Sequence, residues 1–263
     1  MTALPAAPLG YAAAMRRLAG ASELLDGPLD DPAVLRGNLR DLARINRWFG
    51  GTRASRRALD RLLGRRTVPH TLLDVGTGAA DIPLALIAEG VRRGRPLRVI
   101  GVDSRPEVIE AALALDPGLA MAEGLELSVS DGRSLPWPDG AFDVVHCSLL
   151  VHHLEPRDAI AFLREAARVA RLGVVVNDLV RARRHLLAAR VVLPLMTRNR
   201  YTLSDGPMSV QRAYTRVELR ALLAAADLRP VAEARAILGH RVAIAAVPMH
   251  SDLRPTPSAQ GGA

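Results

Sequence analysis

Two acidic residues bracket a pair of glycines in a segment that could hold a small charged molecule. Residues 72–82 read LLDVGTGAADI: an apolar run ends at Asp74, Gly76 and Gly78 follow, and Asp81 closes the segment. A segment of this kind leaves a β-strand, turns on its glycines and opens a helix, and its backbone N–H groups can approach a ligand closely. The pattern therefore predicts a site for a nucleotide-like cofactor at the end of this strand.

The charges of this segment distinguish two classes of cofactor. Aligning the dinucleotide pattern G-x-G-x-x-G/A on the glycine pair puts Asp81 at the third small position, where a carboxylate is too large and repels a pyrophosphate. S-adenosylmethionine carries a sulfonium and an ammonium group, and both are attracted by Asp74 and Asp81. The segment therefore predicts S-adenosylmethionine and disfavours an NAD-dependent oxidoreductase.

Further candidate cofactor residues follow the next predicted strands. Asp103 ends the second strand, where its carboxylate can accept hydrogen bonds from both ribose hydroxyls, and Ser104 comes next. Asp131 and Gly132 follow the third strand, in a position to contact the adenine. Taken singly, Asp103 could be a helix N-cap, although Ser104 serves better there. Cys147, at the end of the fourth strand, completes the predicted cofactor residues, with a buried structural role as the alternative.

Two adjacent histidines are the candidate catalytic groups. The segment SLLVHHLEP places His152 and His153 after the fourth strand, near the expected position of the sulfonium. Histidine titrates near neutral pH and suits removal of a proton from a phenolic hydroxyl. The alternative is a structural wall bonded to the backbone. Asp178 ends the fifth strand and either orients the substrate or faces water, whereas Arg181 and His185 are expected at the surface.

Composition and charge exclude several functions. The 263 residues include 49% apolar and 24% charged residues, which is globular composition. The formal charge of +8 comes from arginine alone, and aromatic residues are only 3%, too few for the base-stacking surface of a single-strand binder, so we expect no nucleic-acid partner. The fourth strand continues as HCSLLVHH, without the N/D-P-P-aromatic tetrad of a DNA adenine methyltransferase. The single cysteine excludes zinc cages of several thiolates, and we predict no metal site.

The sequence contains neither a secretory signal nor a stretch that would span a bilayer. The N-terminus lacks a basic region ahead of its apolar part, and the longest apolar stretches are too short or carry charge. We therefore expect a cytoplasmic location. The alternative is a peripheral position at the inner face of the membrane.

Strand and helix patterns alternate along most of the chain, which predicts an α/β fold with a Rossmann-like, mostly parallel sheet and helices on both faces. A helical segment over 31–66, broken at Gly50 and Gly51, precedes this alternation, and residues 197–209 are expected to be a loop. The predicted strands are 71–75, 97–103, 125–129, 142–149, 173–178, 230–237 and 241–248, and the helices are 82–93, 106–115, 156–170, 182–196 and 216–227.

These patterns divide the chain into three parts. Residues 1–66 are expected to hold a disordered start and an N-terminal helical cap. Residues 67–250 form the predicted catalytic domain, with a lid inserted at about 180–215, and residues 251–263 are expected to be a disordered tail.

Four segments resemble the ordered motifs of class I S-adenosylmethionine-dependent methyltransferases: LLDVGTGAADIP, VIGVDSRPEVIEAA, VSDGRSLPWPDGAFDVVHCSLLVHHL and VVVNDL. The resemblance spans about residues 68–180 and is strongest to the ubiquinone/menaquinone-type methyltransferases. It departs at Ala80, where the family has its last loop glycine. The resemblance implies a seven-stranded sheet that ends in a reversed hairpin. The residues that it implies around the cofactor are Asp74, Gly76, Gly78, Asp103 and Asp131.

The flanking segments resemble a narrower group. DLARINRWFGG and SDGPMSVQRAYTRVELRALL look like bacterial methyltransferases paired with type III polyketide synthases, which modify phenolic lipids. The predicted helix over 182–196 is apolar with arginines at both ends, so it could roof a pocket for a hydrophobic chain and rest on an anionic lipid surface, or simply pack on the sheet.

The expected reaction is therefore methyl transfer to a small, lipophilic aromatic acceptor, on oxygen rather than carbon. The alternatives are a C-methyltransferase of a quinone precursor and a non-catalytic S-adenosylmethionine-binding regulator. The oligomeric state stays open.

Overall fold

The computed structural model describes residues 15–64 and 68–249, so the predicted disordered ends at 1–10 and 251–263 lie outside the described residues. The strands are β1 (His70–Val75), β2 (Leu97–Asp103), β3 (Leu125–Val129), β4 (Phe142–Ser148), β5 (Ala170–Leu179), β6 (Leu228–Arg235) and β7 (Arg241–Pro248). The α-helices are α1 (Pro32–Trp48), α2 (Gly51–Leu63), α3 (Asp81–Arg92), α4 (Pro106–Leu115), α5 (Pro156–Val169), α6 (Arg183–Met196), α7 (Arg200–Arg212) and α8 (Arg216–Ala225). Short 3₁₀ turns include η1 (Leu24–Asp26) and η3 (Val151–His153).

The strands form one seven-stranded sheet in the order β3-β2-β1-β4-β5-β7-β6. The first five strands in sequence run parallel, and β7 pairs antiparallel with both β5 and β6. The predicted fold class and the reversed C-terminal hairpin are thus confirmed. Because the chain order reverses between β1 and β4, the carboxyl ends of these neighbours open a crevice where ligands bind in such sheets.

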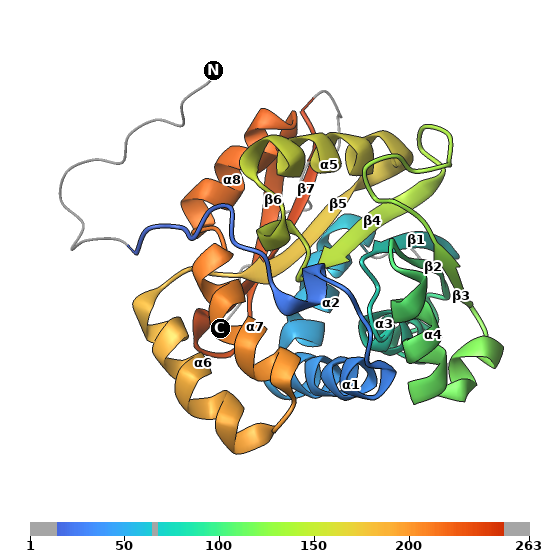
Figure 1. The fold of residues 1–263 in the computed structure, drawn as a ribbon. Coiled ribbons are helices and arrows are strands. Elements are labelled where there is room, and N and C mark those ends of the chain that lie inside the picture. Colours follow the sequence, from blue (N-terminus) through green and yellow to red (C-terminus); the bar gives the residue numbers. More distant parts are fainter. Residues whose placement is uncertain (1–14, 65–67, 250–263) are drawn as a thin grey trace, which may run out of the picture.

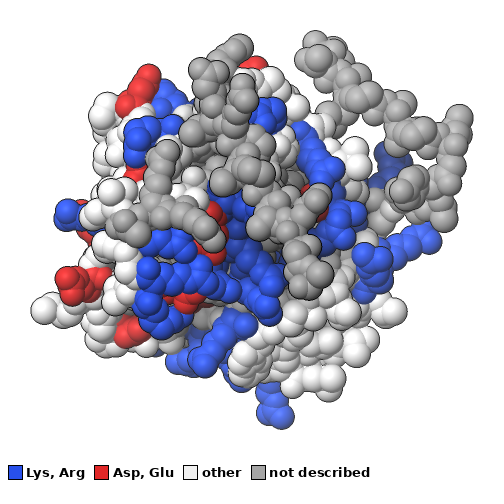
Figure 2. Space-filling view, turned by 180° about the vertical axis from the view of Figure 1, so that it is seen from behind, with Lys and Arg blue, Asp and Glu red and all other residues white. Residues whose placement is uncertain are grey.

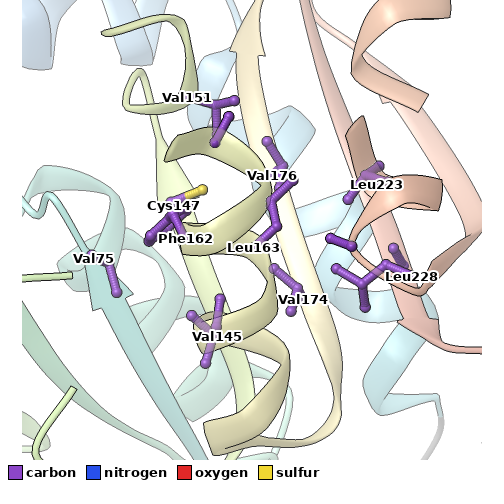
Figure 3. Close-up of a cluster of buried hydrophobic side chains, with 14 of the residues drawn as sticks. Val75, Val145, Cys147, Val151, Phe162, Leu163, Val174, Val176, Leu223 and Leu228 are labelled. Carbon is purple, nitrogen blue, oxygen red and sulfur yellow. The ribbon is translucent and has the colours of Figure 1, made fainter. Parts of the chain in front are cut away.

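Helices cover both faces of the sheet (Figure 1). Neighbouring residues of β1 point to opposite sides: Leu72 packs with α2 and α3, and Leu73 packs with α5 and α8. The second of these clusters is shown in Figure 3, where Val145, Val174 and Phe162 lie together. This two-sided burial explains why the central strands are nearly continuous apolar runs.

The loop predicted at 197–209 is wrong, because most of it belongs to α7. Gly206 and Pro207 are helix breakers by propensity, but tertiary contacts outweigh them. The Asn199 side chain caps the helix by accepting from two backbone N–H groups. At Gly206 a Cβ atom would lie 2.3 Å from Leu193 Cδ1, so a glycine there allows α6 and α7 to pack closely.

Three helices lie together beside the carboxyl ends of the strands. In Figure 1, α1, α6 and α7 form one group, and α7 contacts both of the other helices as well as η1 and η3. The lid predicted at about 180–215 corresponds in position to α6 and α7. Within 15–64 and 68–249, each helix falls short of the length and apolar character needed to cross a membrane.

Part of the basic charge has a structural role. Arginine side chains gather on the face shown in Figure 2, with acidic side chains among them. Three other arginines, Arg181, Arg212 and Arg241, are buried. The formal charge of +8 therefore overstates the charge available for binding an anionic polymer.

Candidate active site

The segment between β1 and α3 is a tight turn at the bottom of a cavity. Gly76 and Gly78 have φ angles of +71° and +53°, which favour glycine. The backbone N–H groups of Gly76 and Thr77 donate to the carbonyl of Val102 on β2, at 2.8 and 2.9 Å. Ala80 keeps the glycine-like conformation with a φ of +54°, which costs a residue with a Cβ about 1–2 kcal/mol. Ala80 therefore adopts the left-handed conformation that a glycine at this position adopts readily.

Asp103 closes the turn from the end of β2. Its Oδ1 accepts from the backbone N–H of Arg105 (3.2 Å) and its Oδ2 from that of Gly78 (3.3 Å). Burial raises the pKa of Asp103, and the nearby charge of Asp74 raises it further, although the backbone donors act in the opposite direction. Within residues 15–64 and 68–249 the carboxylate forms no ion pair with a cationic side chain, which suits a ligand with hydroxyl donors and positive charge.

Asp81 lies at the start of α3 in a similar environment. The side-chain amide of Asn46 donates to both of its oxygens, at 3.0 and 3.3 Å. Burial raises the pKa of Asp81 above its usual value, and the charge of Arg241 partly offsets this. Carboxylates gathered around a glycine turn can accept hydrogen bonds from the ammonium group of S-adenosylmethionine and attract its sulfonium by charge.

Asp74 belongs to a buried network that sequence reasoning missed. Its Oδ1 lies 2.5 Å from Nδ1 of His146, whose Nε2 lies 2.7 Å from the hydroxyl of Ser55. The side-chain amide of Asn177 donates to the same hydroxyl at 2.7 Å. A histidine inside the apolar strand FDVVHCSL was the available signal, because such a residue needs buried partners.

Arg241 connects this network to the helical cap. Its guanidinium donates to Asn46 of α1 (2.5 Å), Ser148 of β4 (2.6 Å) and Asn177 of β5 (3.3 Å). The residue is 1% exposed, and burial lowers its pKa to about 10. One side chain therefore fixes α1, which supplies much of the cavity wall, to the sheet.

The remaining predicted cofactor residues have different positions. Ser104 and Asp131 line the cavity, and Asp131 forms an ion pair with Arg133 that lowers its pKa. Gly132 also lines it, at a point where a Cβ would lie 2.7 Å from Val75 Cγ1, so close packing explains the glycine. Cys147 does not line the cavity: it lies in the apolar cluster of Figure 3, where burial raises the pKa of its thiol. We therefore remove Cys147 from the cofactor site.

A single cavity of about 1080 Å³ joins the glycine turn to the helical cap. Ligand pockets typically measure roughly 300–1,000 Å³, so this one has room for a cofactor and a second molecule. Its lining is mainly apolar beyond the turn. The apolar lining residues include Leu35, Leu39, Leu42, Ile45, Phe49, Val108, Leu150, Ala188, Ala189, Val192, Leu193 and Val210.

His152 and His153 lie on η3 and line the same cavity. Nδ1 of His152 is 2.6 Å from Asp178 Oδ1, and Nδ1 of His153 is 2.9 Å from Asp26 Oδ1. The His152 side chain is buried, whereas that of His153 is 23% exposed. Each imidazole is thus oriented by a carboxylate, as in pairs where a carboxylate holds a histidine base.

Glu23 is the acidic residue that sequence reasoning missed. Its carboxylate lies 3.9 Å from Nε2 of each histidine, His152 and His153. Burial raises the pKa of Glu23, although the neighbouring charge of His153 and the hydroxyl of Ser209 act against this. The residue lies about 130 positions before the histidines in the sequence, and only the packing of η1 against α7 brings them together, so no local pattern identifies it.

The predicted surface positions of Arg181 and His185 are wrong, and the alternative that Asp178 faces water is excluded. Arg181 is 7% exposed, and its guanidinium pairs with Glu218 of α8 at 2.7 Å. This ion pair holds the segment between β5 and α6 against α8. His185 is buried, with Nδ1 2.8 Å from the carbonyl of Val180. Asp178 does not face water but is buried against His152.

Comparison with known proteins identifies the domain that contains this site. The profile of a methyltransferase domain matches residues 73–176. Residues 73–176 form a methyltransferase domain. It contains the glycine turn, Asp103 and both histidines of η3, whereas Glu23, Asn46 and Arg241 lie outside it.

Curated relatives match this domain over part of their length. The chain is 34% identical over 122 residues to ajmaline N-methyltransferase from Rauvolfia serpentina, covering 45% of this chain and 38% of that protein. It is 36% identical over 106 residues to demethylmenaquinone methyltransferase from Thermus thermophilus, covering 40% of this chain and 44% of the relative. The matched part thus spans less than half of the length of these relatives.

Solved structures share the fold over most of the chain. An O-methyltransferase family 2 protein from Planctomyces limnophilus in complex with apigenin superimposes with a TM-score of 0.60, at 20% identity, over 84% of this chain and 63% of its own. An S-adenosylmethionine-dependent methyltransferase from Aquifex aeolicus has a TM-score of 0.56, at 20% identity, over 82% and 97%. These similarities confirm the methyltransferase fold.

Proposed function

We propose that this protein transfers the methyl group of S-adenosylmethionine to a hydroxyl oxygen of a small, lipophilic aromatic acceptor. The observation that carries the proposal is the single cavity, which runs from the acidic glycine turn past two histidines into an apolar chamber. Bound S-adenosylmethionine supplies an electrophilic methyl group on a sulfonium. The protein must then hold the acceptor in line, exclude water and receive the hydroxyl proton.

The glycine turn and its acids hold the cofactor in this proposal. Asp103 accepts hydrogen bonds from the ribose hydroxyls. Asp74 and Asp81 provide negative charge that attracts the ammonium and sulfonium groups. Gly76 and Gly78 allow the backbone to approach the ligand. Ser104, Asp131 and Gly132 line the part of the cavity assigned to the adenine.

The chamber between α1, α6 and α7 holds the acceptor. Apolar side chains of all three helices line it, which supports a lipophilic molecule. The side-chain amide of Asn38, on α1, donates to Thr202 at 3.1 Å, but its buried Oδ1 accepts no hydrogen bond from the described residues. Asn38 lines the cavity and can therefore bind a donor group of the acceptor.

The histidines of η3 receive the hydroxyl proton in this proposal. His153 is the member of the pair that is partly exposed in the cavity, and Asp26 holds its ring. Nε2 of His153 lies 3.9 Å from the Glu23 carboxylate, which is also 3.9 Å from Nε2 of His152. A positioned base of this kind contributes typically about 10²–10⁴-fold to the rate.

Replacing His153 by alanine is expected to lower the rate of methyl transfer by about 10²-fold or more. The affinity for S-adenosylhomocysteine, the demethylated cofactor, should stay unchanged, because the histidine lies outside the glycine turn. Transfer of a labelled methyl group under single-turnover conditions and calorimetric titration measure the two quantities. A full transfer rate in His153→Ala would place the proton acceptor elsewhere.

The outer face of α6 supports delivery of the acceptor from a membrane. Leu187, Val191 and Leu195 are 64%, 55% and 83% exposed and follow one another at intervals of four residues, so they form an apolar stripe. Arg190 and Arg198 are exposed beside this stripe. An apolar stripe with flanking cations fits an anionic lipid surface. This proposal places the acceptor in the membrane fraction of the cell.

The class of the acceptor has a second candidate. The similarity to demethylmenaquinone methyltransferase favours carbon methylation of a quinone precursor as the alternative reaction. Phenolic lipids made by type III polyketide synthases are the first candidate substrates, because the flanking segments resemble methyltransferases that are paired with such synthases. The side chains of Glu23, His152 and His153 can also accept a hydrogen bond from a hydroxyl group, which suits a phenol.

A further inference from the structure

Three side chains with metal-binding atoms converge on the cavity wall beside η3. One ligand atom each of Glu23, His152 and His153 lies within 4.8 Å of the others. The two shortest separations from the Glu23 carboxylate, to Nε2 of each imidazole, are both 3.9 Å. All three residues line the cavity, so a molecule in the acceptor chamber has access to this point.

The outer hydrogen bonds of both imidazoles fix which nitrogen carries the proton. Asp178 accepts at Nδ1 of His152 (2.6 Å), and Asp26 accepts at Nδ1 of His153 (2.9 Å). A carboxylate accepts hydrogen bonds, so each Nδ1 carries the proton, and a neutral imidazole presents the lone pair of Nε2 to Glu23. A carboxylate behind each histidine is the usual arrangement around metal-binding imidazoles.

The Glu23 carboxylate is also held from behind. The hydroxyl of Ser209 donates to its Oε2 at 2.8 Å, and Arg212 lies 3.4 Å from Oε1. The backbone N–H groups of Leu24 and Leu25, directly after Glu23, donate to Asp205 of α7 at 2.9 and 3.0 Å. The third ligand is therefore fixed in place by α7.

Three carboxylates surround the two imidazoles, those of Glu23, Asp26 and Asp178. Among the described residues, Arg212 forms ion pairs with Glu23 and Asp26, and the charge of Arg241 acts on Asp178. Arg17 also lies near, but it pairs with Glu155. The negative charge of these carboxylates favours a cation beside the two Nε2 atoms.

We propose that Glu23, His152 and His153 bind one divalent transition-metal ion, such as Zn²⁺ or Fe²⁺. Two imidazoles and one carboxylate are a donor set of both ions when further positions stay open to a substrate. Metal–ligand bonds of about 2.0–2.1 Å place ligand atoms roughly 3.3 Å apart in a tetrahedral site. The candidate ligand atoms lie within 4.8 Å of one another, and the two 3.9 Å separations join His152 to Glu23 Oε1 and His153 to Glu23 Oε2. Binding therefore requires the side chains to move inward by roughly 1 Å or less each.

The role of the ion rests on the proposed function. An acceptor hydroxyl would fill the open position, and binding to a cation favours its ionised form, with the proton released to solvent. With both Nε2 atoms bound to the ion, the ion takes over the role that the proposed function gives to the histidines, because it favours ionisation of the hydroxyl itself. Variants of His152 or His153 would then lose activity because they lose the ion. Since loss of a base would also lower the activity, ion binding must be measured directly.

The test uses the full chain without a polyhistidine tag, freed of metal by EDTA and then titrated with Zn²⁺ by calorimetry and with Co²⁺ by visible absorption. We expect one ion per chain. Glu23→Gln and His153→Ala should weaken Zn²⁺ binding by about 10²-fold or more. His240→Ala removes another histidine that lines the cavity but lies outside the cluster, and it should leave the affinity unchanged.

Two further measurements separate the possible failures. Circular dichroism and binding of S-adenosylhomocysteine show whether each variant is folded. The metal site is overturned if Zn²⁺ does not bind saturably, or if His153→Ala and His240→Ala bind it equally well. In that case, methyl transfer at full rate after EDTA treatment still supports the proposed function. One bound ion that depends on Glu23 and His153 supports the site even where no acceptor is methylated, an outcome that counts against the proposed function alone.

Discussion

Asp103→Ala is expected to weaken the binding of S-adenosylhomocysteine by about 100-fold or more. The carboxylate would accept two hydrogen bonds from the ribose hydroxyls, and each hydrogen bond to a charged group contributes about 1.5–3 kcal/mol to the binding free energy. Because about 1.4 kcal/mol corresponds to a tenfold change in affinity, losing both lowers the affinity by about 100-fold or more. The variant also removes the acceptor for the backbone N–H groups of Gly78 and Arg105, which shapes the turn. Calorimetric titration with S-adenosylhomocysteine measures the effect.

The chain offers a matched control at Asp116. This exposed carboxylate also follows a secondary-structure element and accepts from a backbone N–H two residues further on, that of Gly118 at 3.0 Å. Asp116→Ala therefore removes the same kind of turn contact away from the cavity, and its affinity should equal that of the unchanged protein. Equal affinity in Asp103→Ala would remove Asp103 from the cofactor site.

Arg241→Met is expected to lower the free energy of unfolding by about 3–5 kcal/mol, because removal of a buried charged partner leaves its counterpart uncompensated. The guanidinium is buried, and its charge acts on both Asp81 and Asp178. It also donates hydrogen bonds to side chains of α1, β4 and β5. Methionine retains much of the volume but none of these donors.

Urea unfolding followed by circular dichroism measures this change. Arg98→Met is the control, since Arg98 is an exposed arginine on β2 and a surface substitution usually changes stability by less than about 0.5 kcal/mol. A loss below about 1 kcal/mol in Arg241→Met would mean that the buried network contributes little to the attachment of α1.

The fold was accessible from sequence because its signals are local. The strand ends at Val75 and Asp103 and the turn at Gly76 follow from the periodicity and from the glycines a few residues away. The same local rules fail at α7, where Gly206 and Pro207 indicate a loop. There the helix depends on the Asn199 cap and on close packing against α6, which only the tertiary structure supplies.

The site was accessible in part for the same reason. Side chains directly after strands meet at one edge of the sheet, so the acidic residues and the histidine pair could be predicted from their positions. Glu23 and Arg241 could not, because they come from opposite ends of the chain and reach the site through contacts with α7 and α1. The burial of Arg181 and His185 was missed because their partners, Glu218 and the Val180 carbonyl, define the environment only after folding.

Methyl transfer itself is the central claim, and one measurement addresses it together with the nature of the acceptor. The purified protein is incubated with methyl-labelled S-adenosylmethionine and, separately, with the membrane and soluble fractions of a lysate of its source organism. Each reaction is then extracted with an apolar solvent. Asp103→Ala provides the background, because it should lack the bound cofactor.

We expect label in the apolar phase of the reaction with the membrane fraction, and none above background with Asp103→Ala. Mass spectrometry of the labelled product would then identify the acceptor and show whether oxygen or carbon carries the methyl group. Label confined to the aqueous or precipitated material would contradict a lipophilic acceptor. No transfer to either fraction, by a protein that binds S-adenosylhomocysteine, would contradict methyl transfer and favour a cofactor-binding regulator.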